Sequence, residues 1–164
     1  MSYPEPPYLA ENGEVSAVYR PATTEPELKI GTITDASYLA TGTTTNGQFG
    51  LYRWDMCPQP SGPAAHFHRT MSESFFVLSG VVRLYNGDIW IDGHPGDFLY
   101  VPEGGIHAFR NESGAPASIL LLFVPGAPRE AYFETLAEVA GGRRQMTGED
   151  WAQLFLQHDN IMVP

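Results

Sequence analysis

Cysteine and basic residues are scarce in this chain. Cys57 is the single cysteine among 164 residues, so no disulfide can form within the chain. Lysine and arginine together number 9 against 19 aspartates and glutamates, which gives a formal net charge of -10. Phosphate backbones and anionic lipid headgroups repel such a chain, so neither nucleic acid nor a membrane surface is the expected partner. A small-molecule partner suits this composition better.

Long apolar runs are also missing. The longest, Ile119–Val124, is far shorter than the roughly 20 residues that a membrane-spanning helix needs, and it is expected to be a buried strand. The first residues show neither the basic nor the apolar stretch of a secretory signal. With no disulfide to form, the cytoplasm is the expected location.

Three regions of different composition follow one another along the chain. Residues 1–29 contain five prolines and no sustained period, which predicts an extended N-terminal arm. Residues 30–125 are short segments rich in β-branched and aromatic residues with turn signals between them, which is typical of an all-β sandwich or barrel. Residues 126–164 are predicted to form helices that pack on this barrel.

Two Asn-Gly pairs predict hairpins, because Asn-Gly tolerates the positive φ angles of a type I′ turn. Asn46-Gly47 is expected to join strands at 40–45 and 48–55. Asn86-Gly87 is expected to join strands at 81–85 and 88–91.

Helical periodicity replaces the strand pattern near the end of the chain. One apolar face is predicted to end at Gly141-Gly142, and Thr147 with Asp150 predicts the capped start of a second helix. The apolar faces of the two predicted helices are Tyr132, Phe133, Leu136 and Val139 in the first, and Trp151, Leu154 and Phe155 in the second.

His66 and His68 are two residues apart, so on a strand both imidazoles project from the same face. Taken alone, such a pair is more often a surface or core pair than a ligand set. Glu73 has the wrong parity to share that face on one continuous strand, so residues 69–72 must turn the chain. That turn would bring Glu73, at the start of a neighbouring strand, beside the two histidines.

The surrounding residues resemble the two conserved motifs of the cupin family. Gly62–Gly80, which holds His66, His68 and Glu73, is similar to the first motif, and Gly96–Asn111 is similar to the second at every fixed position. The glycine that the family has six residues before the first histidine falls here on Pro60, and Gly62 lies nearby.

The resemblance implies a cupin double-stranded β-helix, a jelly-roll barrel of six to eight strands, followed by a short C-terminal helical segment. It implies that His66, His68, Glu73 and His107 hold one divalent transition metal inside the barrel. Three imidazoles and one carboxylate suit Fe, Mn, Ni, Co, Cu or Zn, and affinity alone does not choose among them. Aromatic residues near the ligands are expected to form the wall of a substrate pocket, namely Tyr52, Trp54, Phe75, Tyr100 and Phe109.

A closer resemblance, over roughly Ser37–Ala140, is to single-domain bacterial cupins of the quercetinase-like group. It is carried by Leu39–Gly42, by His66–Arg69, and by Pro125-Gly126 ahead of an acidic helix. That group includes flavonol-cleaving dioxygenases, and its relatives include polyketide cyclases.

Three classes of function stay open at this point. The chain is expected to be a metal-dependent dioxygenase acting on a flavonol-like or other enol or aromatic small molecule. The alternatives are a zinc-type cyclase or isomerase and a non-catalytic binding protein. In the first, Glu73 serves as both ligand and base, which would need only a modest upward shift of its pKa. Exposed strand edges also predict a homodimer, formed through the N-terminal arm or an edge strand.

Overall fold

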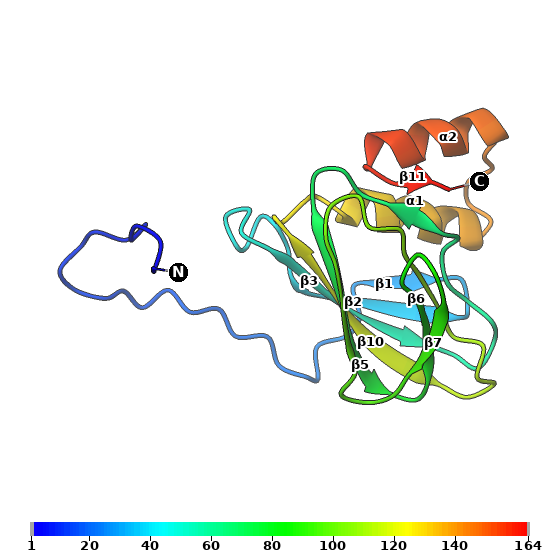
Figure 1. The fold of residues 1–164 in the computed structure, drawn as a ribbon, viewed down its shortest axis with the longest axis horizontal. Coiled ribbons are helices and arrows are strands. Elements are labelled where there is room, and N and C mark those ends of the chain that lie inside the picture. The colour runs from blue at the N-terminus through cyan, green and yellow to red at the C-terminus, as the bar shows by residue number, and fades with distance from the viewer. Residues whose placement is uncertain (1, 164) are drawn as a thin grey trace.

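The computed structural model describes residues 2–163, so the outermost residues of the predicted arm and helical segment, 1 and 164, lie outside it. Strands dominate the described chain, with two short helices near its end (Figure 1). The elements in chain order are β1 (Leu28–Ile30), β2 (Thr34–Ala40), β3 (Gly50–Met56), β4 (His66–Phe67), β5 (Ser72–Ser79), β6 (Val82–Tyr85), β7 (Trp90–Gly93), β8 (Phe98–Val101), β9 (Ala108–Arg110), β10 (Ala117–Val124), α1 (Glu130–Ala140), α2 (Gly148–Gln157) and β11 (Ile161–Met162).

One face of the barrel is a six-stranded sheet in the order β1-β2-β3-β10-β5-β8, and all of its pairings are antiparallel. The opposite face consists of a three-stranded sheet, β7-β6-β9, and the small pair β11-β4. Isolated bridges from Ser61 to Asn111 and from His66 to His107 join these two pieces. The result is the antiparallel all-β barrel with C-terminal helices that the sequence predicts.

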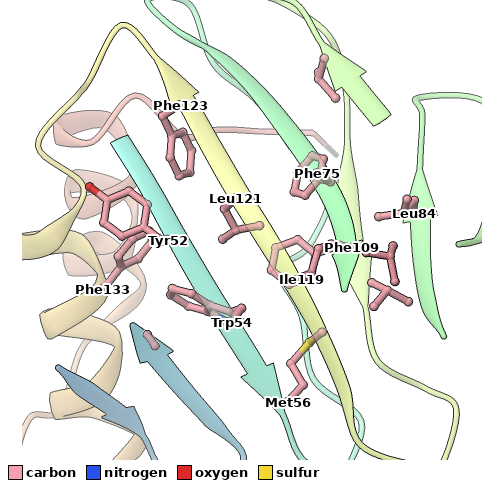
Figure 2. Close-up of a cluster of buried hydrophobic side chains, with 14 of the residues drawn as sticks. Tyr52, Trp54, Met56, Phe75, Leu84, Phe109, Ile119, Leu121, Phe123 and Phe133 are labelled. Atoms are coloured by element: carbon pink, nitrogen blue, oxygen red, sulfur yellow. The ribbon is translucent and has the colours of Figure 1, made fainter. Parts of the chain in front are cut away.

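The core lies between these two faces, because the strands bury every second side chain. On β3, Tyr52, Trp54 and Met56 are buried while Arg53 is exposed to solvent. Figure 2 shows this row continuing across the sheet. The other buried members on β5 and β10 are Phe75, Val77, Ile119, Leu121 and Phe123.

Neither Asn-Gly pair forms the two-residue type I′ hairpin turn that the sequence predicts. Strands β6 and β7 form the predicted hairpin, with Tyr85 opposite Trp90, but its loop spans four residues and only Gly87 has a positive φ. Strands β2 and β3 also pair, although nine residues separate them. The predicted strand segments at 41–45 and 48–49 are therefore wrong, even though Asn46 and Gly47 both take positive φ angles.

The predicted helices are both present. Helix α1 ends at Ala140, ahead of Gly141, and its residues Tyr132 and Phe133 are buried. Thr147 caps α2 in a reciprocal arrangement with Asp150. Helices α1 and α2 lie together beside one end of the barrel (Figure 1). In the part of the chain that the structure describes, no helix has the length and apolarity needed to cross a membrane.

Residues 2–27 contain no strand or helix, and they run away from the barrel as an extended arm (Figure 1). An ion pair between Arg20 and Glu27 lies at its base, where the Glu27 carboxylate also accepts a hydrogen bond from the backbone of Tyr38. Most side chains of the arm are exposed, including those of Tyr3, Leu9 and Val18.

Candidate metal centre

Backbone pairing sets His66 beside His107. His66 N donates to His107 O over 3.0 Å, and His107 N donates to His66 O over 2.9 Å. Residues that exchange both backbone bonds in an antiparallel pair project their side chains from the same face. The imidazole centroids are consequently 4.5 Å apart, and both side chains are buried.

His68 and Glu73 reach the same point from the two sides of a turn. Strand β4 ends at Phe67 and β5 begins at Ser72, so the chain does turn between the two residues as their parity requires. One ligand atom from each of His66, His68, Glu73 and His107 lies within 4.8 Å of the others. All four side chains are at most 6% exposed.

The outer nitrogen of each imidazole meets a backbone carbonyl. His66 Nδ1 lies 2.9 Å from Ala64 O, and His107 Nδ1 lies 2.9 Å from Gly105 O. His68 Nδ1 lies 2.6 Å from the carbonyl of Asp159, near the end of the chain. A carbonyl oxygen only accepts, so each Nδ1 carries the proton and each neutral imidazole presents the Nε2 lone pair inward.

Glu73 turns one carboxylate oxygen toward this group. Its Oε2 lies 3.0 Å from His68 Nε2 and 2.9 Å from His107 Nε2. An anionic oxygen and imidazole lone pairs repel one another at this distance, so the arrangement requires positive charge between them. Within the protein alone, that charge is a proton on an imidazole.

The electrostatics reflect this requirement. Burial raises the pKa of Glu73, but the contacts with His107 and His68 outweigh it and hold the pKa well below its ordinary value. The modest upward shift expected for this carboxyl is therefore wrong. Burial also lowers the pKa of His66, to about 4, and the charge of His107 adds to this effect. His66 is thus kept neutral, as a metal ligand must be.

A divalent transition metal fits this donor set. Three inward-facing imidazole nitrogens and one carboxylate meet in a buried space, and hydrogen bonds to carbonyls fix the orientation of each imidazole. A dication would supply the positive charge that the converging lone pairs require. The four residues that the sequence predicts as ligands are therefore brought together in a form suited to metal.

Glycines of the two motifs shape the loops around this centre. Gly62 has a φ of 142°, and a Cβ there would overlap the carbonyl oxygen of Phe109, so it provides the close approach although the family position falls on Pro60. Gly104, with a φ of 81°, donates its N–H to His68 O over 2.7 Å. Asn111 braces the end of the second motif through bonds to the carbonyls of Cys57 and Ala115.

A cavity of about 550 Å³ opens next to the ligands and is lined by both His66 and Glu73. Its walls come from the inner face of the large sheet and from helices α1 and α2. Most of the lining is apolar or aromatic, as is usual for small-molecule sites. The helices therefore form part of the wall of the site as well as covering the barrel.

The aromatic residues predicted for the pocket divide into three groups. Trp54 and Phe109 line the cavity. Tyr52 and Phe75 are buried in the core but outside the cavity lining. Tyr100 is 57% exposed on the outer face, which contradicts its predicted role. It lies opposite Ser74, whereas its neighbour Val101 lies opposite Glu73 and faces inward.

Sequence reasoning missed the contribution of the C-terminal region. Arg129, Tyr132 and Asn160 line the cavity, and the carbonyl of Asp159 supports His68. No local pattern in the sequence distinguished Arg129 from the other basic residues. Nothing local to Asp159 or Asn160 indicated their place, since they lie about ninety residues from the ligands that they approach.

Comparison with known proteins finds similarity to cupins over the strands that carry this site. Residues 52–123 match the family model described as Cupin domain. Quercetin 2,3-dioxygenase of Bacillus subtilis is 32% identical over 94 residues, which are 57% of this chain. The match spans only 27% of the length of that relative.

Solved structures support the same fold. A predicted oxalate decarboxylase from Thermotoga maritima superimposes with a TM-score of 0.59 and 17% identity, over 66% of this chain and 99% of its own. The polyketide cyclase RemF from Streptomyces resistomycificus gives a TM-score of 0.50 and 20% identity, over 71% of this chain and 80% of its own. At these identities the likeness concerns the fold alone.

Proposed function

We propose that this chain is a metal-dependent enzyme, a dioxygenase that acts on a flavonol-like or other enol-bearing aromatic molecule. The observation that carries the proposal is the complete set of His66, His68, Glu73 and His107, two of which line a cavity of about 550 Å³ that is rich in aromatic side chains. The similarity to the Bacillus quercetin 2,3-dioxygenase supports this reaction class.

The metal would act as a Lewis acid that lowers the pKa of an enol hydroxyl brought next to it. Glu73 is the candidate base for the proton of that hydroxyl. Its contacts with the histidines involve Oε2, which leaves Oε1 as the candidate acceptor for this proton. Removing the proton gives an electron-rich enolate, the form of the substrate that reacts with O₂.

The cavity walls would orient this enolate and keep water from it. Trp54 and Phe109 offer flat apolar surfaces near the ligands, and Phe133 continues the wall under α1. Restricting the substrate to one orientation lowers the entropic part of the barrier. An apolar wall also limits competing protonation of the enolate.

The test is an incubation of metal-loaded protein with quercetin, run in air and under strict anaerobiosis, with oxygen uptake and absorbance recorded together. The proposal predicts loss of the flavonol band with matching oxygen consumption in air and no change without oxygen. No spectral change with any flavonol of a panel would contradict the dioxygenase assignment.

The same assay separates the alternative classes. A zinc-type cyclase or isomerase would use the same acidified hydroxyl and the same base, so its turnover would be equal with and without oxygen. A binding protein would bind ligand without turnover. The intact set of four ligands disfavours this last class, because metal-free binding cupins tend to lose some of these side chains.

We also propose that the chain forms a homodimer. The outer face of β5 and β8, at the edge of the large sheet, exposes a contiguous set of apolar side chains in place of the polar ones that solvent favours. A second copy is the proposed cover, and the extended arm with its exposed aromatic residues is a further candidate contact. The exposed side chains on this face are Phe76, Leu78, Phe98 and Tyr100.

A further inference from the structure

Arg129 is a buried cation, and no carboxylate of residues 2–163 lies within ion-pair distance of it. It precedes α1 and is 4% exposed, although arginine is among the residues that are almost never fully buried unless paired. No Asp or Glu within residues 2–163 forms an ion pair with it. Taking a charge out of water is costly, so an unpaired guanidinium at this depth needs an explanation.

The hydrogen bonds of Arg129 leave donors unused. One terminal nitrogen donates to His158 O over 2.6 Å, and the other donates to Asn160 Oδ1 over 3.1 Å. Guanidinium has five N–H donors in a fixed fork. The Nε–H is buried and has no hydrogen-bond partner within the described chain. Both acceptors are neutral, so no counter-charge contacts the guanidinium directly, and the carboxylates of Glu73 and Asp159 favour its charged form only from a longer distance.

Aromatic rings hold the guanidinium in one place. Its central carbon lies 4.7 Å from the ring centroid of Tyr132, 5.1 Å from that of Phe123 and 5.5 Å from that of Phe133. These contacts offset part of the desolvation and restrict the rotamers of the side chain. A guanidinium fixed in this way is preorganised to bind an anion.

The cavity supplies the place for that anion. Arg129 lines the same cavity as His66 and Glu73. Apart from the histidine, Arg129 and Glu73 are the charged residues of the lining, and Glu73 belongs to the metal-ligand set. Arg129 is therefore the cation available to a ligand inside a protein whose net charge is -10.

We infer that the cavity binds a small aromatic molecule bearing a carboxylate, and that Arg129 binds this carboxylate while the rest of the molecule lies along the apolar wall toward Glu73. Planar fork geometry suits a carboxylate, which accepts two parallel N–H bonds. The inference rests on the proposed function for the identity of the cavity as the substrate site. It narrows the proposed substrates from enol-bearing aromatic molecules in general to those that also carry a carboxylate.

Binding of a matched pair of probes tests the inference. Titration calorimetry with 2-naphthoate and 2-naphthamide compares a carboxylate with its neutral isostere on the same ring system. Metal-loaded wild-type protein should bind the naphthoate about 10- to 100-fold more tightly. Arg129→Gln should reduce this ratio to near one, and Arg129→Lys should give an intermediate ratio. Arg53→Gln, which removes an exposed positive charge from the outer side of β3, should leave the ratio unchanged.

A wild-type measurement keeps the test valid if Arg129→Gln does not fold. In a ¹H–¹⁵N spectrum, the Arg129 Nε–H signal should shift with 2-naphthoate and stay in place with 2-naphthamide. A static signal at saturating naphthoate, a wild-type ratio of one or less, a ratio unaffected by Arg129→Gln, or no naphthoate binding at millimolar concentration would each overturn the inference. Arg129 would then be a structural clamp for His158 and Asn160. No turnover is measured, so this failure is distinct from failure of the oxygen assay.

Discussion

At the scale of single residues, the three histidines and the carboxylate of the metal-ligand set have different chemistry. Each imidazole is oriented by a carbonyl behind it, whereas the described polar contacts of the Glu73 carboxylate are those of Oε2 with His68 and His107. The orientations of the three imidazoles, and so of their metal-ligating nitrogens, are therefore fixed. Glu73 is the ligand with a second oxygen, Oε1, outside these contacts, which makes it the candidate base.

Replacing Glu73 with glutamine should separate these roles. Glu73→Gln keeps the shape and one oxygen donor but cannot accept a proton as a carboxylate does, so turnover should fall at least about 100-fold while metal is retained. Metal analysis and initial rates on the same sample measure both effects. Glu103→Gln, at an exposed carboxylate in the second motif, is the control that should change neither. Full activity of Glu73→Gln would exclude this residue as the base.

Asp159 positions the loop that carries His68. Its carboxylate accepts hydrogen bonds from the backbone of Arg69 and Thr70 and from the Thr70 hydroxyl, while its carbonyl lies against His68 Nδ1. Asp159→Asn should cost roughly 1–2 kcal/mol of unfolding free energy and lower metal affinity about tenfold. Denaturant unfolding and metal competition measure these effects, with exposed Asp88→Asn as the control. An unchanged metal affinity would show that the loop does not depend on this carboxylate.

The contribution of Asp159 should also depend on pH in a defined direction. Partial burial raises its pKa, but hydrogen bonds from Thr70 and Arg69 outweigh this and lower the pKa below the ordinary value of 3.8. A carboxyl whose pKa falls on folding stabilises the protein above its unfolded-state pKa and loses this effect as the pH drops through the folded value. The stability difference between wild type and Asp159→Asn should be constant above about pH 5 and shrink below about pH 4. A difference that grew on acidification would contradict the assignment.

At the scale of elements, helix α1 closes the cavity by packing Phe133 against the sheet. The Phe133 ring lies 4.7 Å from Trp54 and 5.2 Å from Tyr52, centroid to centroid, and Figure 2 shows it against β3. The Tyr52 hydroxyl adds a 2.6 Å hydrogen bond to Glu130 at the start of the helix. The helix is thus joined to the sheet by aromatic packing and by a partly buried polar contact.

Phe133→Ala should therefore destabilise the protein by about 3–5 kcal/mol, since it removes a buried ring and enlarges the cavity. Urea unfolding measures the loss, and Leu156→Ala, on the exposed side of α2, should cost less than about 1 kcal/mol. A loss below 1 kcal/mol for Phe133→Ala would mean that α1 is not held to the barrel by this ring.

The helices, strands and turns also show which features of the fold could be predicted from the sequence. Local patterns predicted the turn between His68 and Glu73, both helices and the cap at Thr147, because each depends on residues close together in the chain. The loop between β2 and β3 depends on distant contacts instead. Gly126 donates to Gly47 O over 2.8 Å, so the loop packs against residues about eighty positions away and the strands end earlier than their composition suggests.

The same distinction applies to the site. Spacing predicted the four residues that meet, whereas the carbonyl of Asp159 and the guanidinium of Arg129 arrive from the C-terminal region through tertiary packing. Tyr100 was misplaced for a different reason. Its aromatic character indicated a buried wall, but the strand alternation places it on the outer face beside Phe98 and Phe76.

At the scale of the whole molecule, the exposed apolar face of β5 and β8 predicts self-association. Sedimentation at micromolar concentration should give the mass of a dimer, and the pair Phe76→Ser with Phe98→Ser should give a monomer, because the two rings lie opposite each other on β5 and β8. Ile89→Ser, an exposed apolar residue in the β6–β7 loop, is the matched control. A monomeric wild type would refute the dimer.

The central claim is that His66, His68, Glu73 and His107 hold one transition metal per chain. Elemental analysis of protein purified without a metal-chelating tag tests it most directly, together with His66→Ala, His68→Ala and His107→Ala. The account predicts about one metal ion per wild-type chain and little in any of the three folded variants, since three remaining ligands bind much more weakly. A wild type that takes up no metal on reconstitution, or a histidine variant that keeps full stoichiometry, would contradict it.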